Sequence, residues 1–228
     1  MTDLAHLLPL ALLGAVLGLD VVSFPQAMIS RPLVAATAAS LLLGDPVRGL
    51  LVGATLEMFA LETLPFGASR YPEWGSAAVV SGGLFTVHVD PGPGALTVAV
   101  LAGLVSAWIG GWSMVQLRKL NARLARRQHD AVAAGSKRVV EGLQVFGLTA
   151  DFVRGGLLSA AMLAIFTPIQ AYVLSTWSSD PRVSRAVVVG IAASVAAGAV
   201  WKVVHAAPGA RWLLLGGVAI GLALLASR

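Results

Sequence analysis

Apolar residues fall in eight runs along the chain, separated by charged, proline and glycine positions. Four short runs occupy the first ninety residues, and each is interrupted or ended by an acidic or proline position before a full span is reached. Longer and cleaner runs follow in the second half. The sequence therefore predicts helices at 7–19, 32–44, 49–66, 76–89, 94–117, 155–177, 186–204 and 212–226.

The lengths of these runs indicate a membrane protein with an unusual first half. A helix that crosses the hydrocarbon core needs about 20 apolar residues, and several early runs fall short. Broken backbone at membrane depth is tolerated only inside protein or beside a watery cavity, and broken helices mark substrate sites in transporters. We expect an all-α integral membrane protein, a polytopic helical bundle with broken or re-entrant helices in its N-terminal half. Ordinary helices with misjudged ends are the alternative.

Composition supports this class. Hydrophobic residues make up 57% of the chain and charged residues only 12%, about half the charged fraction of soluble domains. Mean hydropathy is +0.82. A soluble globular enzyme and a disordered chain are both excluded, because the first needs more charge and the second less hydrophobicity.

Positive charge gathers in one segment after the first clean span. Residues 118–138 carry seven of the sixteen basic residues and one acid, which predicts a cytoplasmic loop by the positive-inside rule. We divide the chain into an N-terminal membrane region (1–117), a basic cytoplasmic loop (118–141) and C-terminal membrane helices (142–228). Arg123, Arg126 and Arg127 are candidates for docking an acidic soluble partner; a solvated, lipid-facing basic helix is the alternative. Nucleic-acid binding is not expected, because the segment has no aromatic residue to stack on a base.

One carboxylate stands out within the apolar runs. Gly49, Gly53 and Glu57 are spaced four apart and so share one helix face, where the glycines would let another backbone approach closely. A carboxylate at the bilayer centre costs about 2.5–3.5 kcal/mol on insertion scales and is usually functional. We expect Glu57 to point into a packed interface and to bond a polar ligand. Glu62 lies off that face.

A polar break separates the first two apolar runs. In residues 23–32, Pro25 and Pro32 remove backbone donors and disfavour helix, while Gln26 and Arg31 supply amide and guanidinium groups. An amide, a guanidinium and a carboxylate suit a neutral polyhydroxyl ligand, which needs donors and acceptors but no charge neutralisation.

The residues near this break leave alternatives open. Arg31 is equally suited to pairing with Asp20 or Asp45, or to reaching lipid head groups. Tyr71 or Trp74 would add an apolar ring face to a sugar site. No cofactor is expected: there is no cysteine, the four histidines share no metal-ligand spacing, and no phosphate-binding G-x-x-x-x-G-K-[ST] motif is present.

Three short motifs in the first half carry a resemblance. R-P-L (31–33), L-L-G-D (42–45) and G-A-T-L-E (53–57), followed by P-F-G-A (65–68), stand at characteristic separations. Over roughly residues 10–90 the chain resembles the membrane subunit IIC of the mannose/fructose/sorbose family of the bacterial phosphotransferase system. The later runs fit that family by hydropathy only.

The resemblance implies a function and partners. Family members import a hexose or related sugar, which is phosphorylated by a soluble IIB subunit supplied through IIA, and IIC works with a second membrane subunit, IID, in a trimeric assembly in the bacterial inner membrane. It implies substrate-binding roles for Glu57, Gln26, Arg31 and Arg70, and for Asp45 a capping or pairing role at a helix end. Asp20, Gly49 and Gly53 would be structural.

Two other functions fit the residues. An ion-coupled secondary transporter or channel would relay protons through intramembrane carboxylates such as Asp20, Glu57 and Glu62. A membrane scaffold or sensor would dock a cytoplasmic protein on the basic segment without transporting anything.

Overall fold

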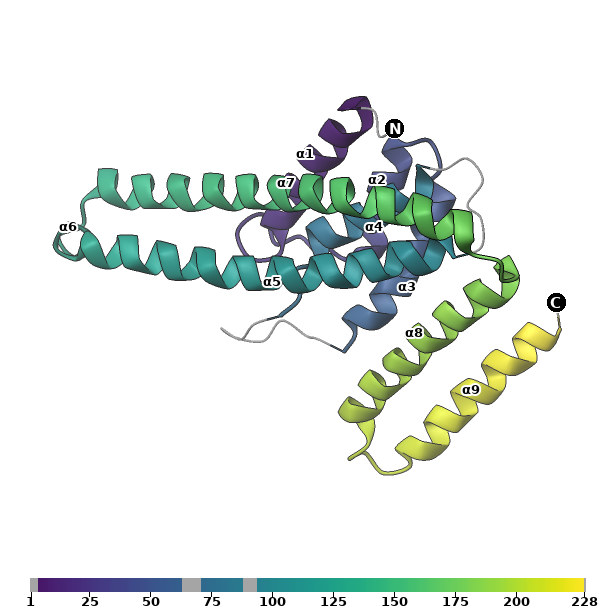
Figure 1. Cartoon of the computed structure of the whole chain (residues 1–228). Helices are drawn as coiled ribbons and strands as arrows, with labels where there is room; N and C mark the ends of the chain where they lie inside the picture. Colours follow the sequence, from purple (N-terminus) through teal and green to yellow (C-terminus); the bar gives the residue numbers. More distant parts are fainter. Residues whose placement is uncertain (1–3, 63–70, 88–93, 228) are drawn as a thin grey trace.

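The computed structural model describes residues 4–62, 71–87 and 94–227, and within them all regular secondary structure is helical (Figure 1). This confirms the predicted all-α class. The helices are α1 (Leu4–Asp20), α2 (Pro32–Leu42), α3 (Pro46–Ala60), α4 (Trp74–Thr86), α5 (Ala95–Arg127), α6 (His129–Ala133), α7 (Lys137–Thr176), α8 (Pro181–Val204) and α9 (Ala210–Ala226).

The starts of several helices follow from local chemistry. Proline, which fixes a helical φ and has no N–H to satisfy, occupies the first position of three helices: Pro32, Pro46 and Pro181. Carboxylates accept first-turn backbone N–H groups at three starts: Asp45, Glu73 and Asp180. These signals set where the short helices of the first half begin.

Helix α4 forms the centre of the bundle. It packs against α1, α2, α3, α5 and α7, and every residue from Gly75 to Thr86 is buried. Neighbouring helices can approach a central helix closely only if its side chains are small, and α4 is built largely of glycine, alanine and serine. A Cβ on Gly82 would lie 2.6 Å from the carbonyl oxygen of Ala36, so α2 and α4 meet backbone to backbone.

Helix α3 approaches α2 in the same way. A Cβ on Gly49 would lie 2.6 Å from the Ser40 Cβ, and one on Gly53 would lie 2.9 Å from the Pro32 carbonyl oxygen. Such separations leave no room for a side chain. The structure thus places the two glycines of α3 against the backbone of α2, so both α3 and α4 contact α2 closely.

Three helices are long and apolar enough to cross a membrane: α5, α7 and α8. By contrast, α2, α3 and α4 have 11, 15 and 13 residues, or about 16–23 Å at 1.5 Å per residue. The hydrocarbon core is about 30 Å thick. Helices α2, α3 and α4 are therefore too short to span the core, and they pack against one another and against α5 and α7 through α4.

The basic segment differs from the loop predicted for it. Helix α5 continues to Arg127, α7 begins at Lys137, and the five-residue α6 lies at the turn between them, so residues 118–141 are mostly the end of a helical hairpin (Figure 1). The loop was expected because the segment is highly charged. Arginine, lysine, alanine and leucine are all strong helix formers, however, and the helices continue into the turn near Gly135, whose φ is +72°. Arg123, Arg126 and Arg127 are exposed on α5.

The last two helices are the least enclosed by the rest of the chain. Helix α8 packs on α3 and α5 and buries only Val188, Ala192 and Ala199. On α9, Leu213 is 77% exposed and Ile220 64%. Apolar side chains this exposed need a nonaqueous surrounding, which agrees with a chain embedded in lipid.

Candidate functional site

The polar break between α1 and α2 is a structured loop organised by Asp20. This carboxylate ends α1 and is 2% exposed. Its Oδ1 accepts a hydrogen bond from the Ala27 N–H at 2.6 Å, and its Oδ2 accepts one from the Ser30 N–H at 2.9 Å. Backbone donors thereby stabilise a buried charge, and Asp20 fixes the shape of the loop.

Two residues of this loop adopt a backbone conformation that side chains seldom adopt. Gln26 has φ +58° and Met28 has φ +62°, in the left-handed region that only a few per cent of non-glycine residues occupy. The Gln26 side chain donates through Nε2 to the Val22 carbonyl oxygen at 2.8 Å. Strained backbone of this kind persists where the surroundings over-determine it, often at ligand sites.

Arg31 joins the loop to α3 through an ion pair with Glu57. The Arg31 guanidinium donates to Glu57 Oε1, and Glu57 Oε2 accepts from the Leu33 N–H at 3.2 Å. One carboxylate thus holds the start of α2 against the end of α3. The two side chains are 31% and 24% exposed, so the pair borders open space. Asp45, in contrast, pairs with Arg48 at 2.9 Å, as a helix-end residue.

A pocket of about 410 Å³ opens beside this loop. Its polar lining includes Asp20, Gln26, Ser30 and Arg31, and Tyr71 and Trp74 close it from the segment that leads into α4. The volume falls within the range of small-molecule sites. Two expected sugar-binding residues, Gln26 and Arg31, therefore share one cavity. Glu57 stands behind Arg31 and does not line it.

The two aromatic residues supply both ring surface and hydrogen-bonding groups. The Trp74 indole N–H is buried and has no hydrogen-bond partner among the described residues. The Tyr71 hydroxyl accepts from Arg118 Nη2 at 2.6 Å, and the guanidinium lies 5.2 Å from the ring centroid. With carboxylate, amide, guanidinium and indole groups around an aromatic wall, the pocket can bond a neutral ligand rich in hydroxyls.

A second charged cluster, which the sequence reasoning missed, supports the loop from α7. Arg154 Nε donates to Asp151 Oδ1 at 2.8 Å, and Arg154 Nη1 lies 3.9 Å from Glu73 Oε2. The Ser23 hydroxyl donates to Asp151 Oδ2, so the cluster reaches the loop. Glu73 is fully buried and Asp151 is 1% exposed. The sequence feature that could have revealed this cluster is the spacing of Asp151 and Arg154. They lie three residues apart at the edge of an apolar run, which places both on one helix face.

The other predicted residues that the structure describes lie apart from this pocket. Arg70 falls outside the described residues. Glu62 follows α3 and pairs with Lys202 at the end of α8. The arginines proposed for docking are on the hairpin. Within the described ranges, no three histidine, aspartate or glutamate side chains gather as a metal site would require.

Comparison with known proteins gives the family. The model of the family described as the sorbose-specific IIC component of the phosphotransferase system matches residues 4–181. The fructose permease IIC component of Bacillus subtilis is 29% identical over 141 residues, 62% of this chain and 49% of that protein. The mannose-specific EIIC component of Escherichia coli K12 is 26% identical over 54% of this chain and 45% of that protein.

A solved structure described as a membrane protein shares the fold, with a TM-score of 0.73 at 18% identity over all of this chain and 94% of that one. The chain spans about half the length of the curated relatives it matches. Its motifs, its membrane helices and the match over residues 4–181 agree: the chain belongs to the family of sorbose-specific IIC components of the phosphotransferase system.

Proposed function

We propose that this chain is the membrane permease subunit, IIC, of a phosphoenolpyruvate-dependent sugar phosphotransferase system. It binds a hexose or related sugar and moves it across the membrane, where a IIB subunit phosphorylates it. The proposal rests on membership of the family and on the pocket beside the α1–α2 loop. The relatives named above act on fructose and mannose, and these are the first sugars to test here.

The observation that carries the proposal is the composition of the pocket wall. Asp20 and the Arg31–Glu57 pair bring charge to the pocket, and Gln26 with the free Trp74 N–H adds neutral polar groups. A sugar brings hydroxyls that both donate and accept and carries no net charge. Because Glu57 pairs with Arg31 from behind, the guanidinium is not an unpaired charge inside the membrane, and its remaining N–H groups can bond sugar hydroxyls in the pocket.

We propose the partners that the family implies. A IID-like membrane subunit completes the sugar path in a trimeric assembly in the bacterial inner membrane, and soluble IIB and IIA carriers deliver the phosphoryl group. The exposed Arg123, Arg126 and Arg127 on the hairpin offer a positive surface for an acidic carrier. Purification from native membranes in mild detergent should recover IID-like and IIB-like proteins; recovery of the chain alone would count against these partners.

The direct test of the sugar site is Glu57→Gln. The change keeps the size of the side chain but removes the charge that holds Arg31, so sugar uptake should be lost while the protein stays folded in the membrane. Glu141→Gln is the matched control, because Glu141 is 60% exposed and pairs only with Lys137 among the charges of the described chain. Uptake that survives Glu57→Gln at the control level would refute the site.

One observation favours a second candidate. Asp20, Glu73 and Asp151 are buried carboxylates in a membrane protein, which is also typical of ion-coupled transporters. The two functions differ in energy source. Uptake into vesicles that requires phosphoenolpyruvate and soluble carriers supports the permease subunit, whereas uptake driven by a proton or sodium gradient alone supports the ion-coupled transporter.

A further inference from the structure

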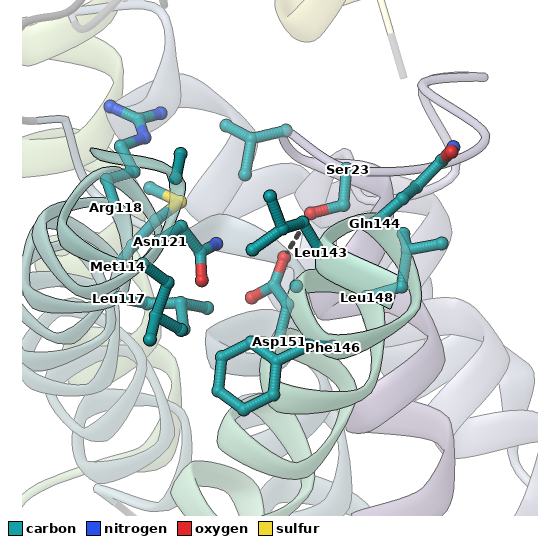
Figure 2. Close-up of a pocket in the computed structure, with 14 residues that line it drawn as sticks. Ser23, Met114, Leu117, Arg118, Asn121, Leu143, Gln144, Phe146, Leu148 and Asp151 are labelled. Atoms are coloured by element: carbon teal, nitrogen blue, oxygen red, sulfur yellow. Dashed lines mark hydrogen bonds between the residues drawn. The ribbon is translucent and has the colours of Figure 1, made fainter. Parts of the chain in front are cut away.

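A second polar pocket lies between α5 and α7, at the base of the helical hairpin (Figure 2). Its volume is about 390 Å³, close to that of the first pocket. Val22 lines both pockets, and the Tyr71–Arg118 hydrogen bond joins a residue of the first to a residue of the second. The two cavities are therefore neighbours, with Val22 and the Tyr71–Arg118 pair between them.

The second pocket has the same kind of chemistry as the first. Arg118 and Asn121 supply donors, Asn121 and Asp151 supply acceptors, and Phe146 supplies a ring. Gln144 also lines the pocket, with its amide pointing away from Asn121 and Asp151 (Figure 2). The side chains of Asn121 from α5 and Asp151 from α7 face each other across the space. The Asn121 Oδ1 is buried and makes no hydrogen bond in the described part of the chain. A buried polar atom without a partner is costly, and a ligand hydroxyl would satisfy it.

Charge decides which ligand fits. The lining contains one cation, Arg118, and one anion, Asp151. Behind it, Arg154 contacts both Asp151 and the buried Glu73, so the formal charges of the lining and of the cluster behind it cancel. A sugar phosphate would bring about −1.5 to −2 charges at neutral pH beside the Asp151 carboxylate. Arg118 already donates to Tyr71, which leaves less of it for a phosphate. The lining therefore favours the uncharged sugar over its phosphorylated product.

We propose that this pocket is a second binding site for the uncharged sugar, occupied after the sugar leaves the pocket at the α1–α2 loop. The inference rests on the proposed function, since it concerns the same ligand. It places the sugar at the base of the basic hairpin before phosphorylation. The Tyr71–Arg118 pair and the loop held by Ser23 and Asp151 form the wall that the sugar passes.

The chain has no cysteine, so a single introduced thiol can report on each pocket. Met28→Cys reports on the first pocket and Leu143→Cys on the second, while Val132→Cys on α6 reports on general access. Each variant, with the complete chain in membrane vesicles, is labelled with a water-soluble maleimide. Fructose, mannose and sorbose are tested separately, with polyethylene glycol at equal osmolality as the control.

We expect sugar to slow labelling of both pocket thiols and to leave Val132→Cys unchanged. At a sugar concentration ten times the dissociation constant, labelling should slow about tenfold, because about one site in eleven is then empty. Adding Asn121→Leu to Leu143→Cys should abolish protection there, and the same change should leave protection of Met28→Cys intact. Gln144→Leu is the matched control: its position is exposed and its amide points away from that space, so protection of Leu143→Cys should stay largely intact.

The possible failures are distinguishable. Protection of Met28→Cys alone would overturn the second site and leave the proposed function standing. Protection of Leu143→Cys that survives Asn121→Leu would mean that the sugar acts there from a distance, which also overturns the second site. Protection of neither thiol by any of the three sugars would overturn the proposed sugar site itself.

Discussion

Replacing Arg154 with methionine tests the charged cluster that supports the site loop. The Arg154 side chain is 10% exposed and lies 2.8 Å from Asp151 and 3.9 Å from Glu73, whose side chains are 2% and 0% exposed. Methionine keeps much of the length of the side chain but none of its charge. Two buried carboxylates would then face each other without a cation.

The size of the effect follows from these distances. At an effective dielectric constant of 20, the two attractions amount to about 6 and 4 kcal/mol before desolvation is subtracted. Desolvation removes much of this gross value, but breaking a buried pair from one side typically costs about 3–5 kcal/mol, because an uncompensated charge remains. We therefore expect Arg154→Met to lower the free energy of unfolding by about 3–5 kcal/mol.

Unfolding in mixed micelles, titrated with sodium dodecyl sulfate, measures this loss. Arg138→Met is the matched control, because Arg138 is exposed on the hairpin and its loss should cost less than about 1 kcal/mol. Adding Asp151→Asn to Arg154→Met should recover part of the stability by removing one orphaned charge. A loss no larger than that of Arg138→Met, or a further loss on adding Asp151→Asn, would refute the reasoning.

Two further predictions concern packing and topology. Gly49→Ala should lower the free energy of unfolding by about 1–3 kcal/mol, because its Cβ would meet the α2 backbone. The control, Gly216→Ala on α9, has open space around it and should be neutral or stabilising. Equal effects of the two changes in the same unfolding titration would contradict the close packing of α3 on α2. Trypsin should cut the hairpin between residues 118 and 141 from one side of sealed vesicles only. That side should be the one from which the Leu143→Cys thiol is labelled. Cleavage from the opposite side would contradict the arrangement of the second pocket.

Local signals predicted much of the first half of the fold. The Gly44-Asp45-Pro46 turn marked where α2 ends, although α3 begins at Pro46 rather than at the predicted residue 49. Asp45 caps α3, a role that only the family resemblance implied. The four-residue glycine spacing pointed to the close face of α3. These features depend on residues near one another in sequence, which a single chain displays directly.

Ion pairs between residues far apart in the sequence could not be predicted from such local patterns. Arg31 was equally suited to Asp20 or Asp45, and it pairs with Glu57, 26 positions away. The Asp151–Arg154–Glu73 cluster joins residues up to 81 positions apart, from α7 and from the segment before α4. The extent of the hairpin was missed for another reason: charged residues end an apolar run without ending a helix.

The exposure of α9 has an evolutionary consequence. Few of its side chains touch the rest of the chain, so within this chain their individual shapes are free to change as long as the helix stays apolar enough for lipid. In α4, by contrast, a Cβ added to Gly75 or Gly82 would meet the backbone of a neighbouring helix, and one added to Gly83 would meet leucine side chains. Substitutions should therefore accumulate quickly along α9 and slowly around α4, and the match to the family model indeed ends at residue 181, where α8 begins.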